Sequence, residues 1–233
     1  MPLIASVRAW GIHLLISNLN NYMSLDYKAL VVFDLDGTLL RGMTVCEVLA
    51  KHLGRLERMH QLERFQTLEE LASAREEMAR WYEGVPTKDL LDALRNATLA
   101  PGAKRGIKLL KRRGVAVSIA SVTWEFAVAH FARLFGVHYW LGTALQLPGK
   151  IDHVWPEDKA QWVEQLCKQL KIPDGMVAAV GDSPSDAELF SVADHAFYVG
   201  YSSVPELLRC THLPGADISE LSKHILESFG IEP

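Results

Sequence analysis

Val31-Val32-Phe33-Asp34-Leu35-Asp36-Gly37-Thr38-Leu39-Leu40 is the stretch that decides the fold of this 233-residue chain. The run Ala29 to Phe33 predicts a buried parallel strand, because it is continuously apolar and rich in Val. Side chains i and i+2 of a strand point to the same side. We therefore expect Asp34 and Asp36 to lie together at the carboxyl end of this strand, where open α/β sheets bind their ligands.

Two carboxylates so close together repel each other unless a cation compensates them. Mg²⁺ is the usual choice, because it prefers carboxylate oxygens together with substrate phosphate. The alternative is an acidic turn that closes a strand, since Asp and Gly are common turn residues. The length and order of the whole pattern favour a magnesium site.

This stretch resembles the nucleophile motif of the haloacid dehalogenase-like (HAD) phosphohydrolases. The resemblance implies that Asp34 attacks phosphorus and becomes an aspartyl-phosphate. It also implies that Asp36 is the general acid and base, and that Thr38 helps to hold the phosphoryl group.

The composition is that of a soluble globular protein, with 49% apolar and 22% charged residues. The net charge of −4 offers no electrostatic attraction to nucleic acid or to an anionic membrane. The three cysteines, Cys46, Cys167 and Cys210, are widely spaced without a metal-binding pattern, which favours reduced thiols in a cytoplasmic protein. We expect a monomer or a homodimer.

Residues 1–23 are interpreted as an N-terminal extension. Their apolar run, Trp10 to Ile16, is interrupted by His13 and is too short for a signal peptide core or a membrane span. A short accessory helix, or an upstream extension of a chain that starts at Met23, would both fit.

The length allows one α/β core, predicted over 24–42 and 100–233, with an inserted subdomain over 43–99. Apolar residues recur at helical spacing through this insertion and predict roughly four helical segments. By resemblance the insertion is a small all-helical cap. The alternative is a crossover connection made of helices, but more than fifty residues is much longer than one crossover needs.

Strands and helices alternate through the rest of the core. This predicts an α/β fold with a Rossmann-like parallel sheet that carries helices on both faces, which is the HAD fold. The expected strands span 115–120, 138–141, 176–180 and 196–199, and a hairpin spans 145–154 with Pro148-Gly149 at its centre. The expected helices span 102–113, 124–135, 157–170, 187–192 and 218–229.

Ser121 follows a buried strand and precedes the helix expected from Trp124. A hydroxyl and free backbone N–H groups at such a place form an anion site, although Ser is also an ordinary helix cap. The family's second motif is a strand that ends in Ser or Thr. By resemblance Ser121, with the neighbouring Val122, binds the phosphoryl group.

Lys159 lies in the first turn of the helix expected from Glu157. A cation there works against the helix dipole, which indicates a function such as phosphate binding. The family's third motif is a Lys near a helix start, which Lys159 matches. Lys150, in the hairpin, and Lys168, late in the helix, are expected to face solvent.

The second specific pattern is Gly181-Asp182-Ser183-Pro184-Ser185-Asp186, which follows a buried strand. It matches the family's fourth motif, GDxxxD. By resemblance Asp182 binds Mg²⁺ together with the Asp34 carboxylate and the Asp36 backbone carbonyl. Asp186 then orients Lys159 or a metal-bound water, and Ser183 and Ser185 contact substrate or water. Acids that cap a helix start are the alternative for Asp186 alone.

A helical insertion directly after the first motif resembles the phosphoserine phosphatase-like branch. That branch binds the substrate ammonium with an acid at the position of Met43, and Glu47 lies one helical turn further. It usually has Gly where this chain has Val122. Arg75 and Arg80 are candidates for the Arg that binds the substrate carboxylate in that branch.

We therefore expect Mg²⁺-dependent hydrolysis of a phosphomonoester, with a small phosphorylated metabolite as the partner. Transfer of the phosphoryl group to an alcohol would use the same residues. A non-catalytic regulator that binds a phosphorylated ligand is the third alternative. Such a protein is expected to lack Asp34, Asp36, Lys159 or Asp182, and all four are present.

Overall fold

The computed structural model describes residues 26–146, 150–204 and 209–233. The interpretation of residues 1–23 as an extension therefore lies outside the described residues, and so does the hairpin centre at Pro148-Gly149. The described part of the chain contains no helix that is both long enough and apolar enough to span a bilayer.

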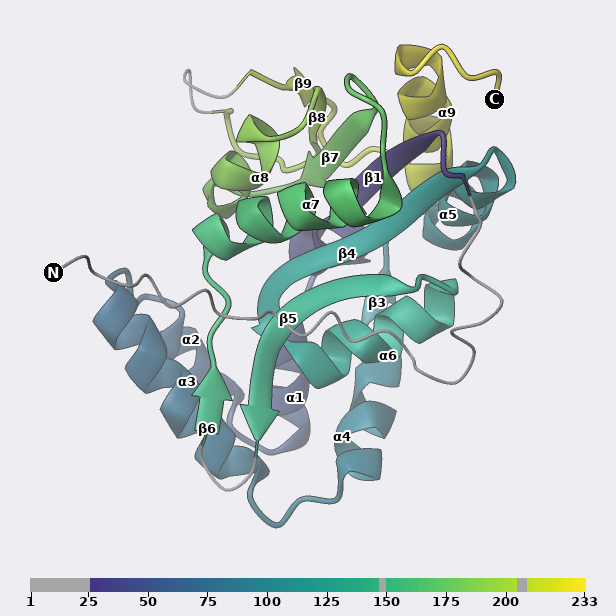
Figure 1. Cartoon of the computed structure of the whole chain (residues 1–233). Helices are drawn as coiled ribbons and strands as arrows, with labels where there is room; N and C mark the ends of the chain where they lie inside the picture. The colour runs from purple at the N-terminus through teal and green to yellow at the C-terminus, as the bar shows by residue number, and fades with distance from the viewer. Residues whose placement is uncertain (1–25, 147–149, 205–208) are drawn as a thin grey trace, which may run out of the picture.

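A seven-stranded sheet, ordered β6-β5-β4-β1-β7-β8-β9, forms the centre of the molecule (Figure 1). The central strand β1 pairs in parallel with β4 on one side and with β7 on the other. Only the pair β5–β6 at one edge is antiparallel among the described strands of this sheet. The strands are β1 (Ala29–Phe33), β4 (Val115–Trp124), β5 (Tyr139–Gln146), β6 (Lys150–Asp152), β7 (Val177–Gly181), β8 (His195–Tyr198) and β9 (Thr211–His212).

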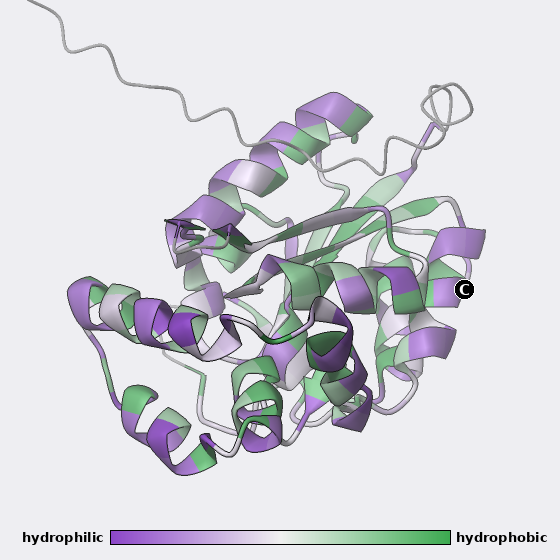
Figure 2. Cartoon of the chain, turned by 90° about the horizontal axis from the view of Figure 1, so that it is seen from below, coloured by the Kyte–Doolittle hydropathy of each residue, from purple (hydrophilic) through white to green (hydrophobic). Residues whose placement is uncertain are grey.

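Helices cover both faces of this sheet, as the alternation of strand and helix predicts. Ala29, Val31 and Phe33 of β1 pack into one apolar cluster, and Leu30 and Val32 pack into the other. The first cluster includes α5 (Ala103–Arg112), α6 (Glu125–Phe135) and α9 (Ile218–Ser228). The second includes α7 (Pro156–Leu170) and α8 (Ala187–Ser191). Figure 2 shows the central strands largely green and the outer helices striped with purple, as two apolar faces require. The predicted fold class is confirmed.

In the described residues four α-helices separate the first strand from the rest of the core. They are α1 (Val45–His52), α2 (Leu56–Leu62), α3 (Leu68–Tyr82) and α4 (Thr87–Ala93), and a 3₁₀ turn (Leu94–Asn96) follows. The strands β2 (Leu40–Arg41) and β3 (Thr98–Leu99) pair antiparallel, so the two ends of this insertion lie side by side. Figure 1 shows the helices grouped below the sheet, beyond the carboxyl ends of β1 and β4.

Two strands differ from the sequence-based prediction. β4 does not end near Ser121 but continues to Trp124, with an irregularity between Ala120 and Trp124 in its pairing with β5. A short strand over 138–141 and a separate hairpin were expected next. Instead β5 runs without a break to Gln146, and its last residues pair with β6. Both differences arise from pairing between strands, which local residue patterns do not encode.

Helices α5 and α9 pack closely because α5 carries Gly106 at their contact. A Cβ built on Gly106 would lie 2.4 Å from the carbonyl oxygen of Ile218 and 2.5 Å from Ser222 Oγ. Both neighbours are held in place, because the Ser222 hydroxyl donates to that same carbonyl at 2.7 Å. A side chain at position 106 therefore forces the helices apart.

We predict that Gly106→Ala destabilises the fold. Alanine in a helix interior gains about 1 kcal/mol over glycine, and overpacking costs about 1–3 kcal/mol, so the net loss is up to about 2 kcal/mol. Urea unfolding measures this change in the free energy of unfolding. Lys104→Ala, at an exposed position of the same helix, is the control, and a stabilised Gly106→Ala protein would contradict the close contact.

Candidate active site

The carboxyl end of β1 delivers Asp34 next to β7. The Asp34 N–H donates to the carbonyl of Val180 at 2.9 Å, which continues the parallel pairing of the two strands. The strand itself ends at Phe33, and Gly37 adopts a φ of 76° in the turn that follows. Neither acid is a strand residue as expected, because Asp34 follows the last residue of β1 and Asp36 lies in that turn.

Lys159 joins Asp34 to Asp186. Its Nζ donates to Asp34 Oδ1 at 2.7 Å and to Asp186 Oδ1 at 2.8 Å, and the residue is fully buried. The two carboxylates raise the pKa of the Lys159 ammonium, although burial opposes them. Burial raises the pKa of Asp34 well above its usual range, while the Lys159 charge lowers it. The ammonium is therefore a fixed charge that holds two acids in position.

Asp186 acts mainly as a scaffold for the loop after β7. Its Oδ2 accepts the backbone N–H groups of Asp182 at 3.1 Å and of Ser183 at 3.2 Å. Its Oδ1 accepts from Lys159. Because both oxygens already have partners, Asp186 orients the loop and the lysine.

The carboxylates of Asp34, Asp182 and Asp186 each place an oxygen within 4.8 Å of the others. Asp34 uses Oδ1 for Lys159, and Asp182 uses Oδ1 for the Thr38 hydroxyl at 3.2 Å. Among the described residues, no hydrogen bond reaches Oδ2 of Asp34 or Oδ2 of Asp182. These two oxygens have the donor chemistry that Mg²⁺ requires, and the group fits such an ion.

Burial, together with the charge of Asp186, raises the pKa of Asp182 to about 6. Gly37 lies against this carboxylate. A Cβ built on Gly37 would lie 2.0 Å from Asp182 Oδ2, so only glycine allows the turn to approach. Sequence reasoning assigned no function to Gly37, and its place in the motif was the available signal.

Asp36 faces the helical insertion. Its Oδ1 accepts the Val45 N–H at the start of α1 at 2.8 Å. Burial raises the pKa of Asp36 to about 7, against the lowering effect of that hydrogen bond. Its carboxylate lies outside the group formed by Asp34, Asp182 and Asp186, and only its backbone carbonyl was predicted to touch the metal.

Ser121 and its neighbours lie in the irregular part of β4, ahead of α6. The buried Ser121 Oγ accepts the Thr123 N–H at 3.4 Å, so its own hydrogen is free to be donated. The helix expected from Trp124 is present, because α6 begins at Glu125 with Trp124 as its N-cap residue. β4 pairs with β5 only up to Ala120 and again at Trp124, so the residues in between do not use their N–H groups in that pairing.

The other predicted phosphate-binding residues have partners within the described structure. The Val122 carbonyl accepts from the Thr143 hydroxyl at 2.9 Å. Ser185 Oγ lies 2.6 Å from Ser183 Oγ. Thr38 donates to Asp182, as described above, so it would have to exchange this acceptor to bind a phosphoryl group. Lys150 and Lys168 are exposed, as expected.

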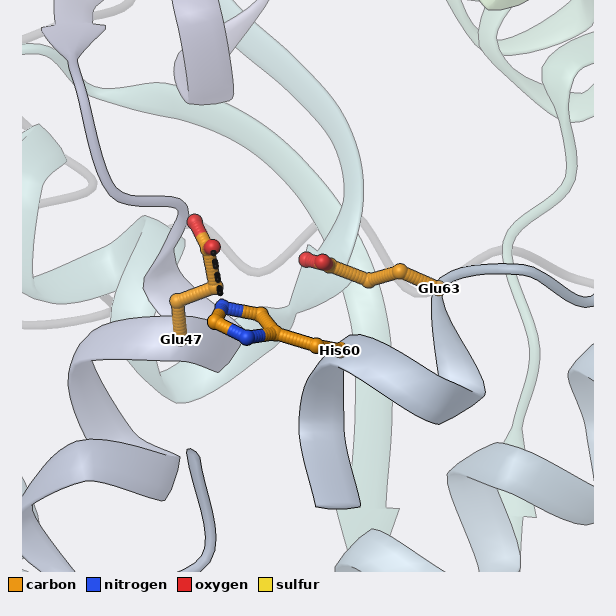
Figure 3. A group of neighbouring side chains, drawn as sticks. All are labelled: Glu47, His60 and Glu63. Carbon is orange, nitrogen blue, oxygen red and sulfur yellow. Dashed lines mark hydrogen bonds and ion pairs between the residues drawn. The ribbon is translucent and has the colours of Figure 1, made fainter. Parts of the chain in front are cut away.

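Glu47 of α1 forms a group with His60 of α2 and with Glu63, and Figure 3 shows the three side chains turned toward one another. One oxygen of Glu47 accepts the Thr44 N–H at 2.7 Å, and the other lies 3.2 Å from His60 Nε2. Both oxygens are thus used within the insertion. Met43, at the position of the expected acid, packs against the main apolar cluster.

Arg75 of α3 binds the core directly. Its Nη2 donates to the carbonyls of Val122 and Val154, each at 3.1 Å, and its guanidinium lies 4.3 Å from the centre of the Trp155 ring. Burial lowers its pKa to about 10. Sequence reasoning missed this connection between the insertion and the core. Arg80, the other candidate, is exposed.

Three comparisons relate the chain to known proteins. A family model for haloacid dehalogenase-like hydrolases matches residues 31–191. A phosphoserine phosphatase from Methanocaldococcus jannaschii is 26% identical over 176 residues, which cover 71% of this chain and 82% of that protein. Another phosphoserine phosphatase, from Idiomarina loihiensis, is 25% identical over 212 residues, which cover 87% of this chain and 93% of that protein. A crystal structure of phosphoserine phosphatase in its apo form shares the fold, with a TM-score of 0.71 at 21% identity. The match covers 84% of this chain and 98% of that chain.

We predict that Asp36→Asn changes the pH dependence of stability in metal-free protein. Between pH about 4 and about 7 the unfolded chain releases the Asp36 proton while the folded chain keeps it, so the wild-type protein loses stability as pH rises. The variant avoids this loss. Its stability relative to wild type should therefore rise by about 2–4 kcal/mol across that window and stay level outside it.

Urea unfolding at a series of pH values measures this difference. Asp174→Asn, at an exposed position, is the matched control and should show no such trend. A difference between Asp36→Asn and wild type that does not vary with pH would show that the Asp36 pKa is not raised.

Proposed function

The chain belongs to the haloacid dehalogenase-like hydrolases, and from this premise we propose that it is a Mg²⁺-dependent phosphatase acting on a small phosphomonoester through an aspartyl-phosphate. One observation supports this proposal most strongly. A buried lysine ammonium bridges Asp34 and Asp186, while one oxygen of Asp34 and one of Asp182 remain available to a cation.

Asp34 and Asp182 would hold the Mg²⁺ ion through these oxygens, with the Asp36 carbonyl as a further ligand. When bound, the ion supplies positive charge against the phosphoryl oxygens and keeps the Asp34 carboxylate ionised. Lys159 adds a second fixed positive charge beside the same carboxylate.

The first step is attack of the Asp34 carboxylate on phosphorus, with cleavage of the bond between phosphorus and the ester oxygen. Asp36 gives its proton to the leaving oxygen. A pKa of about 7 suits this transfer, because the carboxyl group is then substantially protonated at neutral pH.

The second step is hydrolysis of the aspartyl-phosphate. Asp36, now ionised, takes a proton from the water that attacks phosphorus. The bond between phosphorus and Asp34 breaks, inorganic phosphate leaves, and both acids return to their starting states. The different partners of the two acids support this division of work, because Lys159 holds Asp34 and the Val45 N–H holds Asp36.

The Ser121 hydroxyl and the backbone N–H groups of the irregular segment of β4 would bind the phosphoryl group, with Thr38 and Ser185 as further donors. We further propose that residues 43–99 are a cap over the site, and that 24–42 and 100–233 form the core. The contact between Asp36 and the start of α1 supports this, because it links the general acid to the insertion.

We also propose a small phosphorylated metabolite as substrate, since the similar proteins named above are phosphoserine phosphatases. A cytoplasmic location is consistent with Cys46, Cys167 and Cys210, which are all unpaired. A monomer or homodimer remains our expectation.

We predict that Asp34→Asn abolishes hydrolysis of p-nitrophenyl phosphate in Mg²⁺ buffer. The amide is a much poorer nucleophile than the carboxylate, so the turnover number should fall by at least about 10³-fold. EDTA should silence the wild-type enzyme, and added Mg²⁺ should restore it. Asp174→Asn is the matched control for the loss of one carboxylate, and an Asp34→Asn protein that retains turnover would exclude this nucleophile.

A further inference from the structure

The helical insertion contains a second group of side chains that could hold a metal ion, apart from the active site. Glu47 lies on α1, His60 lies on α2, and Glu63 directly follows α2. Each offers one ligand atom, and these atoms all lie within 4.8 Å of one another. Figure 3 shows the three side chains turned toward a common space. The proposed reaction uses none of them, so the group has no assigned function.

Glu47 is fixed in position before any ligand binds. Its Oε2 accepts the Thr44 N–H at 2.7 Å, and its own N–H donates to the Thr44 hydroxyl at 3.2 Å. Its side chain is only 18% exposed. The second oxygen, Oε1, lies 3.2 Å from Nε2 of His60. The capping interaction therefore holds one carboxylate oxygen toward α2.

Glu63 is not explained by an ordinary surface ion pair. The contact between Glu47 and His60 needs no third partner, yet the Glu63 carboxylate faces the same two residues. It forms no hydrogen bond or ion pair with any described residue, and Glu63 is exposed enough to turn toward water. Partial burial and the Glu47 charge raise its pKa, while His60 lowers it. No Lys or Arg of the described chain pairs with either carboxylate, so a cation between them would relieve their repulsion.

The C-terminal helix provides a comparison. His224 and Glu227 of α9 form an exposed pair at 3.7 Å, three residues apart on one helix. Among the described residues, no third ligand completes a metal-binding group there. Glu47, His60 and Glu63 differ, because their ligand atoms come from two helices and from the residue that follows the second. This is the arrangement of a chelating site rather than of a local ion pair.

The donor set suits Zn²⁺. Two ligand atoms bound at about 2.0–2.1 Å to a tetrahedral ion lie about 3.3 Å apart, which is close to the 3.2 Å between Glu47 Oε1 and His60 Nε2. A neutral imidazole nitrogen with carboxylate oxygens favours Zn²⁺ over Mg²⁺, which prefers oxygen ligands alone. Mn²⁺ binds such donors more weakly than Zn²⁺. The His60 side chain is 51% exposed, so water can complete the coordination.

We propose that Glu47, His60 and Glu63 bind a Zn²⁺ ion that joins α1 to α2. The α2 helix has seven residues, Leu56–Leu62, and a helix of this length is not stable by itself in water. The ion would hold it against α1. It would also stabilise the start of α1, because Glu47 caps the residue that precedes Val45. This inference goes beyond the proposed phosphatase function and does not depend on it.

Calorimetry tests the site in metal-free, full-length protein. Asp182→Asn is used as the background, because it removes one carboxylate of the active-site group. Zn²⁺ should bind this protein with one equivalent, and excess Mg²⁺ should not displace it. Glu63→Gln and His60→Asn should each weaken binding by at least about 10-fold, since loss of even a ligand's hydrogen-bonding partner costs about 10–100-fold. His224→Asn, which removes an exposed imidazole from α9, is the matched control and should bind like its parent.

Two further measurements separate a specific site from a nonspecific effect. On addition of Zn²⁺ the imidazole resonances assigned to His60 should shift and the melting temperature should rise, and both changes should be lost in Glu63→Gln. Thermal unfolding without metal checks that each variant is folded. Binding that is the same in Glu63→Gln and His60→Asn as in their parent would overturn the proposal. So would a His224→Asn protein that loses Zn²⁺ to the same degree, or the absence of a bound equivalent.

Discussion

The site depends on one buried interaction, the sharing of the Lys159 ammonium between Asp34 and Asp186. Three side chains from three separate elements meet there with almost no solvent contact, at 0% exposure for Lys159, 6% for Asp34 and 0% for Asp186. Removing one partner of such a group would leave an uncompensated buried charge, which typically costs about 3–5 kcal/mol. The parallel pairing of β1 with β7 makes the meeting possible, because it sets the ends of the two acidic motifs side by side.

The electrostatics divide the acids into two functions. Asp34 and Asp182 lie close together with one free oxygen each, so a divalent cation relieves their repulsion. Asp36 accepts a hydrogen bond from the start of α1, and burial brings its pKa to about 7. A nucleophile that is kept ionised and a proton carrier poised near neutrality are the two parts that the proposed mechanism requires. Arg75 and the Asp36–Val45 hydrogen bond connect the helical insertion to the core and to Asp36. Movement of the insertion would therefore change the position of Asp36.

Sequence patterns predicted the features that depend on local composition and order. The buried strands before Asp34 and Asp182, the helical insertion and the parallel sheet with helices on both faces all follow from apolar runs and their spacing. Features that depend on contacts between distant residues were not predictable in this way. The turn at Gly37 takes Asp36 out of the strand alternation, and pairing with β5 extends β4 past Ser121 to Trp124. Arg75 finds its acceptors in β4 and in the segment that follows β6. The assigned functions of the site residues remain predictions that rest on this geometry.

Anomalous diffraction from crystals grown with Mn²⁺ in place of Mg²⁺ tests the central claim most directly. The account predicts one strong peak between the carboxylates of Asp34 and Asp182, at about 2 Å from an oxygen of each, with Lys159 still bound to Asp34. A map without a peak at this place, or with its only peak at Glu47, His60 and Glu63, would contradict the account.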